Sequence, residues 1–336
     1  MIITRTPFRI SFAGGGSDIP AFYEKHSGCV LSTTINKYMY ISVHPSFIQK
    51  NTVLKYSETE TVLNKREIKH KYFKAILNKL DVEGVEITST ADIPAGTGLG
   101  SSSAFSVGLL HSLYSYKGKF VSKEKLASEA CDIELLKLRQ PIGKQDQYAS
   151  AYGGMNFYMF NSDGSVFVEP VIMNKSAQEK LEQNLMLFYI GGNHSAGEIL
   201  KEQTANISSG EKEIGQLKLC TLAQELKRNL ECGNVNMMGE ILHEGWEIKR
   251  TLATGISNSK IDEVYNIARK NGAIGGKLLG AGGGGFLLLY VPEKQHNNVR
   301  NALRLVEMPF SMEGQGSSVI YVGTKPDYDF AKKRLF

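Results

Sequence analysis

The chain has 336 residues, and its 42% hydrophobic and 22% charged residues are typical of a globular protein with a buried core, which excludes a disordered or fibrous chain. Lys and Arg total 39 against 34 Asp and Glu, a small excess that favours small anionic ligands and lacks the clustered charge of a nucleic-acid-binding protein. The longest apolar run, residues 286–291, is too short to span a bilayer, so we expect no membrane insertion.

Cysteine spacing and the N-terminus predict the compartment. Arg5 and Arg9 interrupt what would have to be the apolar core of a secretory signal. The cysteines show no CxxC pair and no zinc spacing, which predicts reduced thiols. They are Cys29, Cys131, Cys220 and Cys232. We therefore expect a cytoplasmic protein.

Three glycine clusters carry most of the information, since dense glycine usually marks a sharp turn or the close approach of a ligand. The first follows a predicted strand over residues 6–13, in which Arg9 lies on the polar face. Asp18 is placed to cap the short helix that begins near Pro20, and it is equally placed to contact a ligand. The cluster and the two residues after it are Gly14, Gly15, Gly16, Ser17 and Asp18.

The second cluster lies between a predicted strand, residues 85–93, and a predicted helix over residues 104–116 that stops at Gly118. It reads Pro94-Ala95-Gly96-Thr97-Gly98-Leu99-Gly100-Ser101-Ser102-Ser103. A strand, a glycine loop and a helix N-terminus bind phosphate, because free backbone N–H groups converge there and the helix dipole favours negative charge. The alternative is a capped helix after an ordinary loop, which requires one serine and not three.

The third cluster, residues 280–285, contains a formal G-x-G-x-x-G. A dinucleotide-binding fingerprint follows a strand and opens a helix, whereas this cluster follows a helical pattern at residues 260–271 and leads into the buried strand at 286–291. We therefore expect its backbone to pack against a ligand that is held elsewhere.

Two carboxylates stand near these clusters. Glu134 lies on the small, apolar stripe of a helix predicted from Ser122 to about Arg139, where it requires a partner or a metal, unless that face is solvated. Asp146 opens a further helix, either as a cap or as a base for a sugar hydroxyl, with Lys144 nearby to keep it ionised. The histidines show no H-x-x-x-H pair, so we expect no zinc site.

Taken together and in this order, the three clusters resemble the GHMP kinases, the family of galactokinase, homoserine kinase and mevalonate kinase. The resemblance covers nearly the whole chain. It implies an α+β fold of two domains, with a ribosomal S5 domain 2-like ATP-binding domain over residues 1–182 and a ferredoxin-like domain over residues 183–336. Nucleotide and acceptor are expected to lie in the cleft between them.

The resemblance also implies roles for individual residues. Asp146 matches the catalytic Asp of the family, and Arg9 its neighbouring basic residue. Ser102 and Glu134 match the Mg²⁺ ligands. The expected ATP-binding residues are Pro94, Gly96, Thr97, Gly98, Leu99, Gly100, Ser101, Ser102 and Ser103. The expected acceptor-binding residues are Gly14, Gly15, Gly16, Ser17, Asp18, Gly282, Gly283 and Gly284.

Within the family, the segments around Arg9, Asp146, Trp246 and Lys277 resemble members that phosphorylate the anomeric hydroxyl of a D-glycero-α-D-manno-heptose 7-phosphate with MgATP. Another sugar-1-kinase, fucokinase-like or galactokinase-like, is the nearer alternative, and a non-catalytic binding protein of the same fold the more distant one. His194 lies where many heptose kinases keep Arg, so the resemblance does not carry a contact with the 7-phosphate over to this position. We expect no nucleic acid or membrane partner, and a homodimer is compatible with the sequence.

Overall fold

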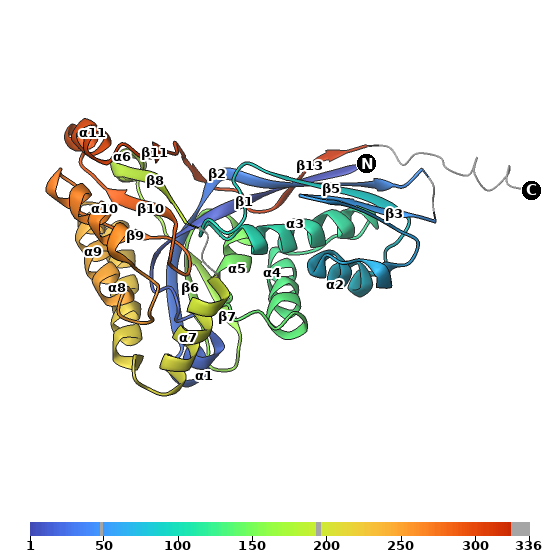
Figure 1. The fold of residues 1–336 in the computed structure, drawn as a ribbon, viewed down its shortest axis with the longest axis horizontal. Coiled ribbons are helices and arrows are strands. Elements are labelled where there is room, and N and C mark those ends of the chain that lie inside the picture. Colours follow the sequence, from blue (N-terminus) through green and yellow to red (C-terminus); the bar gives the residue numbers. More distant parts are fainter. Residues whose placement is uncertain (48–49, 193–195, 324–336) are drawn as a thin grey trace, which may run out of the picture.

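The computed structural model describes residues 1–47, 50–192 and 196–323, which form two sheets with helices packed beside them (Figure 1). The larger, nine-stranded sheet runs in the order β13-β1-β2-β5-β3-β4, and β12 and β6 pair with β2 while β7 pairs with β6. Its strands are β1 (Ile2–Ala13), β2 (Gly28–Pro45), β3 (Thr52–Lys55), β4 (Thr59–Val62), β5 (Val85–Ala91), β6 (Met155–Phe160), β7 (Val166–Pro170), β12 (Met312–Glu313) and β13 (Ser318–Val322). The long antiparallel pair of β1 and β2 forms its centre.

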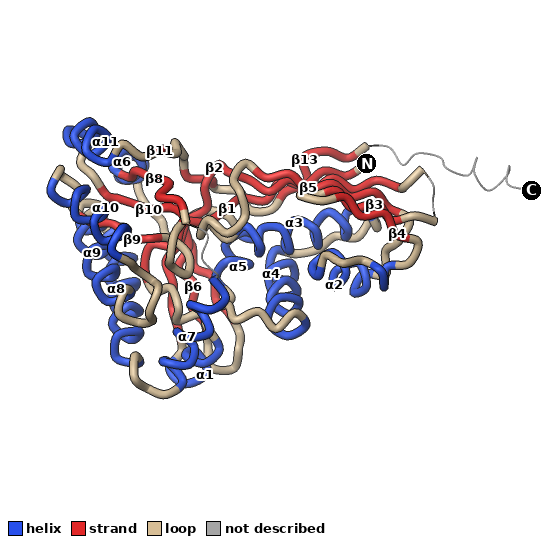
Figure 2. The backbone as a smooth tube through the Cα atoms, in the orientation of Figure 1, coloured by secondary structure: helices blue, strands red, loops and turns tan. Residues whose placement is uncertain are grey.

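Four helices lie along one face of the larger sheet (Figure 2). They are α2 (Lys71–Leu80), α3 (Ser101–Tyr116), α4 (Lys123–Cys131) and α5 (Gln145–Tyr152). Helix α3 packs against β1 and β2 and is apolar on most sides, as expected of a buried helix. The backbone of Gly108 comes so close to β1 that a β-carbon there would lie 2.8 Å from Thr6 Oγ1. The predicted strand at 85–93 and helix at 104–116 are thus confirmed to within a few residues.

The second sheet is four-stranded and antiparallel. Its order is β11 (Val306–Glu307), β8 (Leu185–Gly191), β10 (Gly285–Tyr290) and β9 (Gly275–Leu278). The helices of this half are α8 (Glu213–Glu231), α9 (Met237–Lys249), α10 (Ser259–Lys270) and α11 (His296–Leu303). Helix α9 packs on β9 and β10, and α8 packs on β1 and β2 and so ties the two halves together. Mixed helix and sheet in two halves is the α+β class that we expected.

The chain crosses between the halves more than once. Strand β8 begins at Leu185, close to the predicted boundary after residue 182. Beyond the second sheet, however, β12 and β13 return to the first sheet, where β13 pairs with β1 at its edge. The domain boundary between residues 182 and 183 therefore stays a prediction. Residues 312–322 lie beyond it in sequence but pair with strands of the first sheet.

Three further α-helices lie in the described residues: α1 (Pro20–His26), α6 (Lys175–Asn184) and α7 (Ala196–Ser208). Short 3-10 helices cover Lys65–Glu67 and Glu293–Gln295. Helix α7 contacts α1 and α8 beside the junction of the two halves. Within the described residues, we find no helix with both the length and the apolar character that crossing a membrane requires.

Candidate active site

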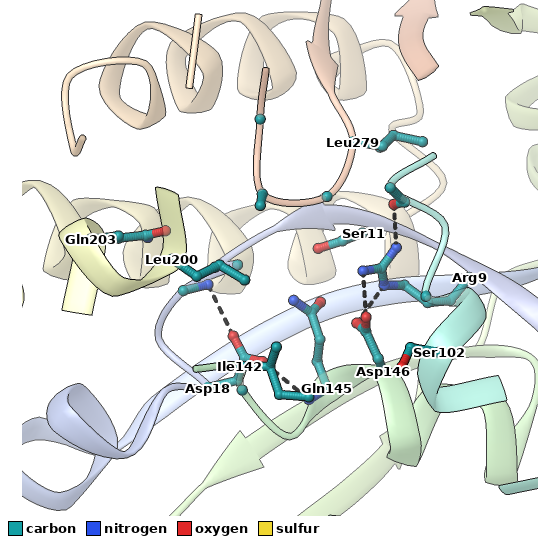
Figure 3. A pocket seen from close by; sticks show the side chains of 18 of the residues that line it. Arg9, Ser11, Asp18, Ser102, Ile142, Gln145, Asp146, Leu200, Gln203 and Leu279 are labelled. Atoms are coloured by element: carbon teal, nitrogen blue, oxygen red, sulfur yellow. Dashed lines mark hydrogen bonds and ion pairs between the residues drawn. The ribbon is translucent and has the colours of Figure 1, made fainter. Parts of the chain in front are cut away.

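The three glycine clusters, far apart in sequence, meet at one cavity of about 230 Å³. The first cluster reaches it from the end of β1, the second from the N-terminus of α3, and the third from the loop between β9 and β10. Figure 3 shows the side chains that surround this space. The lining members of the clusters are Gly15, Gly16, Asp18, Gly96, Gly98, Gly100, Ser101, Ser102, Gly280, Ala281, Gly282 and Gly284.

The second cluster forms a loop whose backbone alternates in handedness. Gly96, Gly98 and Gly100 have φ of 79°, 87° and 74°, whereas Thr97 and Leu99 keep negative φ. Such alternation turns successive backbone N–H groups toward one side and creates a concavity for anions. No side chain caps α3, so the N–H groups of its first turn stay available at the cavity. This loop (the phosphate loop) has the conformation that phosphate binding requires, and no serine side chain caps α3. Its binding of phosphate stays a prediction.

The third cluster packs directly on the second. A β-carbon on Gly98 would lie 2.5 Å from Leu279 O, and one on Gly285 would lie 2.4 Å from Thr97 O. Glycine is therefore required where these two backbones touch. The third cluster therefore contacts the phosphate loop from the other half of the molecule, and its contact with a ligand stays a prediction.

Asp146, in the first turn of α5, forms a two-point ion pair with Arg9 from β1 (Figure 3). Arg9 Nε lies 2.6 Å from Asp146 Oδ1, and Arg9 Nη2 lies 2.7 Å from Oδ2. The third nitrogen, Nη1, donates to Gly98 O of the phosphate loop at 2.7 Å. Bidentate pairing fixes the carboxylate in position. The cationic partner of Asp146 is Arg9 and not Lys144, whose Nζ donates to Gly164 O instead.

Asp18 does not cap α1, which begins at Pro20 after Ile19 without a side-chain cap. Its carboxylate instead accepts the backbone N–H of Gly16 at 2.9 Å and that of Gln145 at 3.1 Å. Asp18 thus joins the glycine turn to the start of α5 at the edge of the cavity. Burial and the charge of Asp146 raise the pKa of Asp18. The cap interpretation is wrong because both oxygens are already engaged by these two amides.

Glu134 is fully buried, so the solvated-face alternative is excluded. The predicted helix over residues 122–139 is α4 followed by a π-helix over Asp132–Lys137, a form that often marks functional sites. Glu134 Oε2 accepts from Ser103 Oγ at 3.0 Å and from Gln147 Nε2 at 3.1 Å, while its buried Oε1 has no partner. Burial raises the pKa of Glu134 to about 7.

Of the three serines at the start of α3, Ser102 and Ser103 point in different directions. Ser103 turns inward to Glu134, and Ser102 lines the cavity and donates to the hydroxyl of Tyr72 at 2.5 Å. Other expected site residues shape the loops from behind the cavity wall. Thr97 Oγ1, for example, donates to Pro94 O. Those that do not line the cavity are Gly14, Ser17, Pro94, Thr97, Leu99, Ser103, Glu134 and Gly283, and His194 lies outside the described residues.

Several cavity residues escaped the sequence analysis. Ser11 and Gln145 line the cavity, and Ser11 Oγ and Gln145 Oε1 are buried without a partner. Gln203 and Leu200 of α7 line the same space (Figure 3). Unpaired hydroxyl and amide groups of this kind suit the hydroxyls of a polar acceptor. Their positions depend on the junction between the halves, for which the sequence holds no local signal.

Lys249 and Lys277 also line the cavity and escaped the sequence analysis. Lys249 continues the buried stripe of α9 that includes Leu242 and Trp246, at spacings of four and three residues. Lys277 sits between buried residues of β9. A lysine on an apolar stripe and a lysine in a buried strand were signals available in the sequence.

A phosphate loop with an Arg-held carboxylate beside it in one cavity is the arrangement expected of a phosphotransferase. Residues 67–154 match the GHMP kinases N terminal domain, and residues 222–306 match the GHMP kinases C terminal domain. The chain belongs to the GHMP kinase family of ATP-dependent phosphotransferases, as the three motifs predicted.

Named relatives include sugar kinases. A D-glycero-alpha-D-manno-heptose 7-phosphate kinase of Campylobacter jejuni is 27% identical, over 93% of this chain and 97% of its own length. A crystal structure of a D-glycero-D-manno-heptose 1-phosphate kinase from Bacteroides thetaiotaomicron has a TM-score of 0.79 and 25% identity, covering 96% of this chain and all of that one. The bifunctional fucokinase/GDP-fucose pyrophosphorylase of Arabidopsis thaliana is 25% identical over 86% of this chain and 30% of its own length.

Proposed function

We propose that this kinase transfers the γ-phosphoryl group of ATP to the anomeric hydroxyl of D-glycero-α-D-manno-heptose 7-phosphate, giving the 1,7-bisphosphate used to build activated heptose for surface polysaccharide. The observation that carries the proposal is Asp146, fixed by Arg9 beside the phosphate loop in a cavity with unpaired polar groups. The heptose kinases among the relatives, which match almost the full chain, support the acceptor.

Each residue contributes in a distinct way. The amides of the 96–103 loop and of the α3 N-terminus hold the phosphates and stabilise charge in transfer. Asp146 accepts the proton of the anomeric hydroxyl, which is more acidic than other sugar hydroxyls and so requires only a moderate base. Arg9 aligns this carboxylate and connects it to Gly98 of the loop, so that base and phosphate keep a fixed relation.

Mg²⁺ is part of the proposal. Glu134 Oε1, buried and unpartnered, and Ser102 Oγ at the cavity are hard oxygen donors of the kind that Mg²⁺ binds. Among the described residues, no group of three acidic, His or Cys side chains surrounds a point where a metal could bind. This fits Mg²⁺, which usually takes its remaining ligands from phosphates and water and supplies charge neutralisation there.

A substrate panel tests the function. Heptose 7-phosphate, the unphosphorylated heptose, fucose and galactose are each offered with MgATP, ADP release is followed, and the product is located by phosphorus NMR. We expect the highest kcat/KM for heptose 7-phosphate and a new phosphate on C1. A preference for fucose or galactose supports the other sugar-1-kinase function. ADP release with none of these sugars contradicts both.

We also propose a cytoplasmic location and a homodimer. A cytoplasmic location is supported by Cys29, Cys131, Cys220 and Cys232, which are all unpaired. For the homodimer, light scattering of the purified chain gives the mass directly, and a mass of 37.1 kDa contradicts it.

A further inference from the structure

Two lysines without an assigned role lie buried in the wall of the cavity. Lys249 ends α9 and is 9% exposed, and Lys277 lies in β9 and is 6% exposed. Lys249 Nζ donates to Leu278 O at 3.2 Å and to Gly280 O at 2.6 Å. Lys277 Nζ donates to Phe12 O at 3.0 Å. Since an ammonium group has three donors, half of the six N–H bonds of the pair are left for a ligand.

No carboxylate of the described residues lies within 4 Å of either ammonium group. The charges that act on the pair are cationic: Arg9 acts on Lys249, and Lys249 and Arg9 act on Lys277. The carboxylate partner of Arg9, Asp146, is held by Arg9 at two points. Burial, with the charge of Arg9 second, lowers the pKa of Lys249 to about 8. Burial and the neighbouring cations lower the pKa of Lys277 well below its ordinary value. Burying two like charges in this way costs stability unless an anion joins them.

The contacts of the pair locate it between the two substrate regions. Lys277 is bound to Phe12 O, two residues before the glycine turn that begins at Gly14. Lys249 is bound to Gly280 O, and a β-carbon on Gly280 would lie 2.5 Å from the α-carbon of Gly98 in the phosphate loop. The two ammonium groups therefore lie along the path from the phosphate loop to the acceptor turn.

We propose that Lys249 and Lys277 form a subsite for a phosphoryl oxyanion, which they bind through their free N–H donors. Its source is either the phosphate that the acceptor already carries or the γ-phosphoryl group in transfer, because both present negatively charged phosphoryl oxygens. The acceptor phosphate is a possible source only if the proposed function is correct. The subsite itself does not depend on which sugar is the acceptor.

The first test measures anion binding without turnover. Inorganic phosphate is titrated calorimetrically into the protein saturated with MgADP, which occupies the phosphate loop. We expect Lys249→Met and Lys277→Met each to weaken phosphate binding at least about tenfold, the usual size of a lost charge-assisted hydrogen bond. Lys117→Met is the matched control, because Lys117 Nζ also donates to a backbone carbonyl, that of Leu80, and lies outside the cavity lining.

Folding is controlled in the same samples. Replacing a buried ammonium by Met removes an uncompensated charge, so the melting temperature without ligands should stay level or rise. If either Met variant fails to fold, the Arg variants replace it in the test. Lys249→Arg and Lys277→Arg keep the positive charge and should therefore retain phosphate binding. Phosphate affinity within about twofold of wild type in both Met variants, or a loss equal to that of Lys117→Met, overturns the subsite.

The second test identifies the source of the oxyanion. If it is the acceptor phosphate, the Met variants raise KM for heptose 7-phosphate and leave kinetics with the unphosphorylated heptose unchanged. If it is the transferring group, kcat falls by the same factor with both acceptors. Unchanged kinetics with both acceptors overturns the subsite. If neither heptose is phosphorylated while phosphate binding still depends on the lysines, the proposed acceptor fails and the subsite is supported.

Discussion

Replacing Glu134 by Gln should change how the stability of the protein depends on pH. The amide keeps the shape of the side chain and its carbonyl still accepts from Ser103, but it cannot ionise. In the wild type, burial raises the pKa of Glu134 to about 7 from an ordinary value of 4.5. The folded protein therefore prefers the neutral acid, and its free energy of unfolding falls as pH rises from about 4.5 to 7, levelling above that range.

The size of the effect follows from the same values. Between pH 5 and pH 8 the wild type should lose about 2.5 kcal/mol relative to Glu134→Gln, which corresponds to roughly 5–10 °C in melting temperature for domains of this size. The melting temperatures of both proteins are measured across this range without nucleotide or Mg²⁺. Glu124→Gln, which removes an exposed carboxylate from α4, is the charge-matched control.

The result that refutes this reasoning is a melting-temperature difference between wild type and Glu134→Gln that stays constant from pH 5 to pH 8. Added MgATP analogue gives a second comparison. Because a cation beside Oε1 favours the ionised acid, ligand should stabilise the wild type more than Glu134→Gln at pH 8. Equal stabilisation would remove Glu134 from the proposed metal site.

Three further variants test the roles of single residues. Asp146→Asn should lower kcat by about 10²–10⁴ and leave nucleotide affinity within a few-fold, as the loss of a general base does; near-normal turnover refutes the base assignment. Gly98→Ala should raise KM for ATP and lower the melting temperature more than Gly96→Ala, since only at Gly98 would the new β-carbon meet backbone, at 2.5 Å from Leu279 O; equal effects contradict the close packing. Ser102→Ala should raise the Mg²⁺ concentration needed for half-maximal rate, and an unchanged titration removes Ser102 from the metal site.

The sequence was informative where function is encoded locally. The order of strand, glycine loop and helix, with glycines at alternate positions, predicted the phosphate loop, and the structure shows Gly96, Gly98 and Gly100 in the left-handed conformation that this spacing serves. Spacing also placed Glu134 on an apolar stripe. The π-helix that carries it has no local signature, and its hydrogen-bond partners Ser103 and Gln147 come from α3 and α5.

Long-range contacts could not be predicted in the same way. The cap interpretation of Asp18 is wrong because Gln145, 127 residues away, provides the competing amide. The lysine pair is an instructive omission: Lys249 and Lys277 lie in apolar patterns, but only the fold brings both to one cavity with Arg9. Residues whose partners lie in the other half of the molecule can be identified only in the folded structure.

The most direct test of the whole account is a crystal structure with Mg²⁺, a non-hydrolysable ATP analogue and heptose 7-phosphate. The account predicts the β- and γ-phosphates against the amides of residues 96–103, with the anomeric oxygen within hydrogen-bonding distance of the Asp146 carboxylate. A triphosphate bound elsewhere, or a different hydroxyl of the sugar at Asp146, would contradict it.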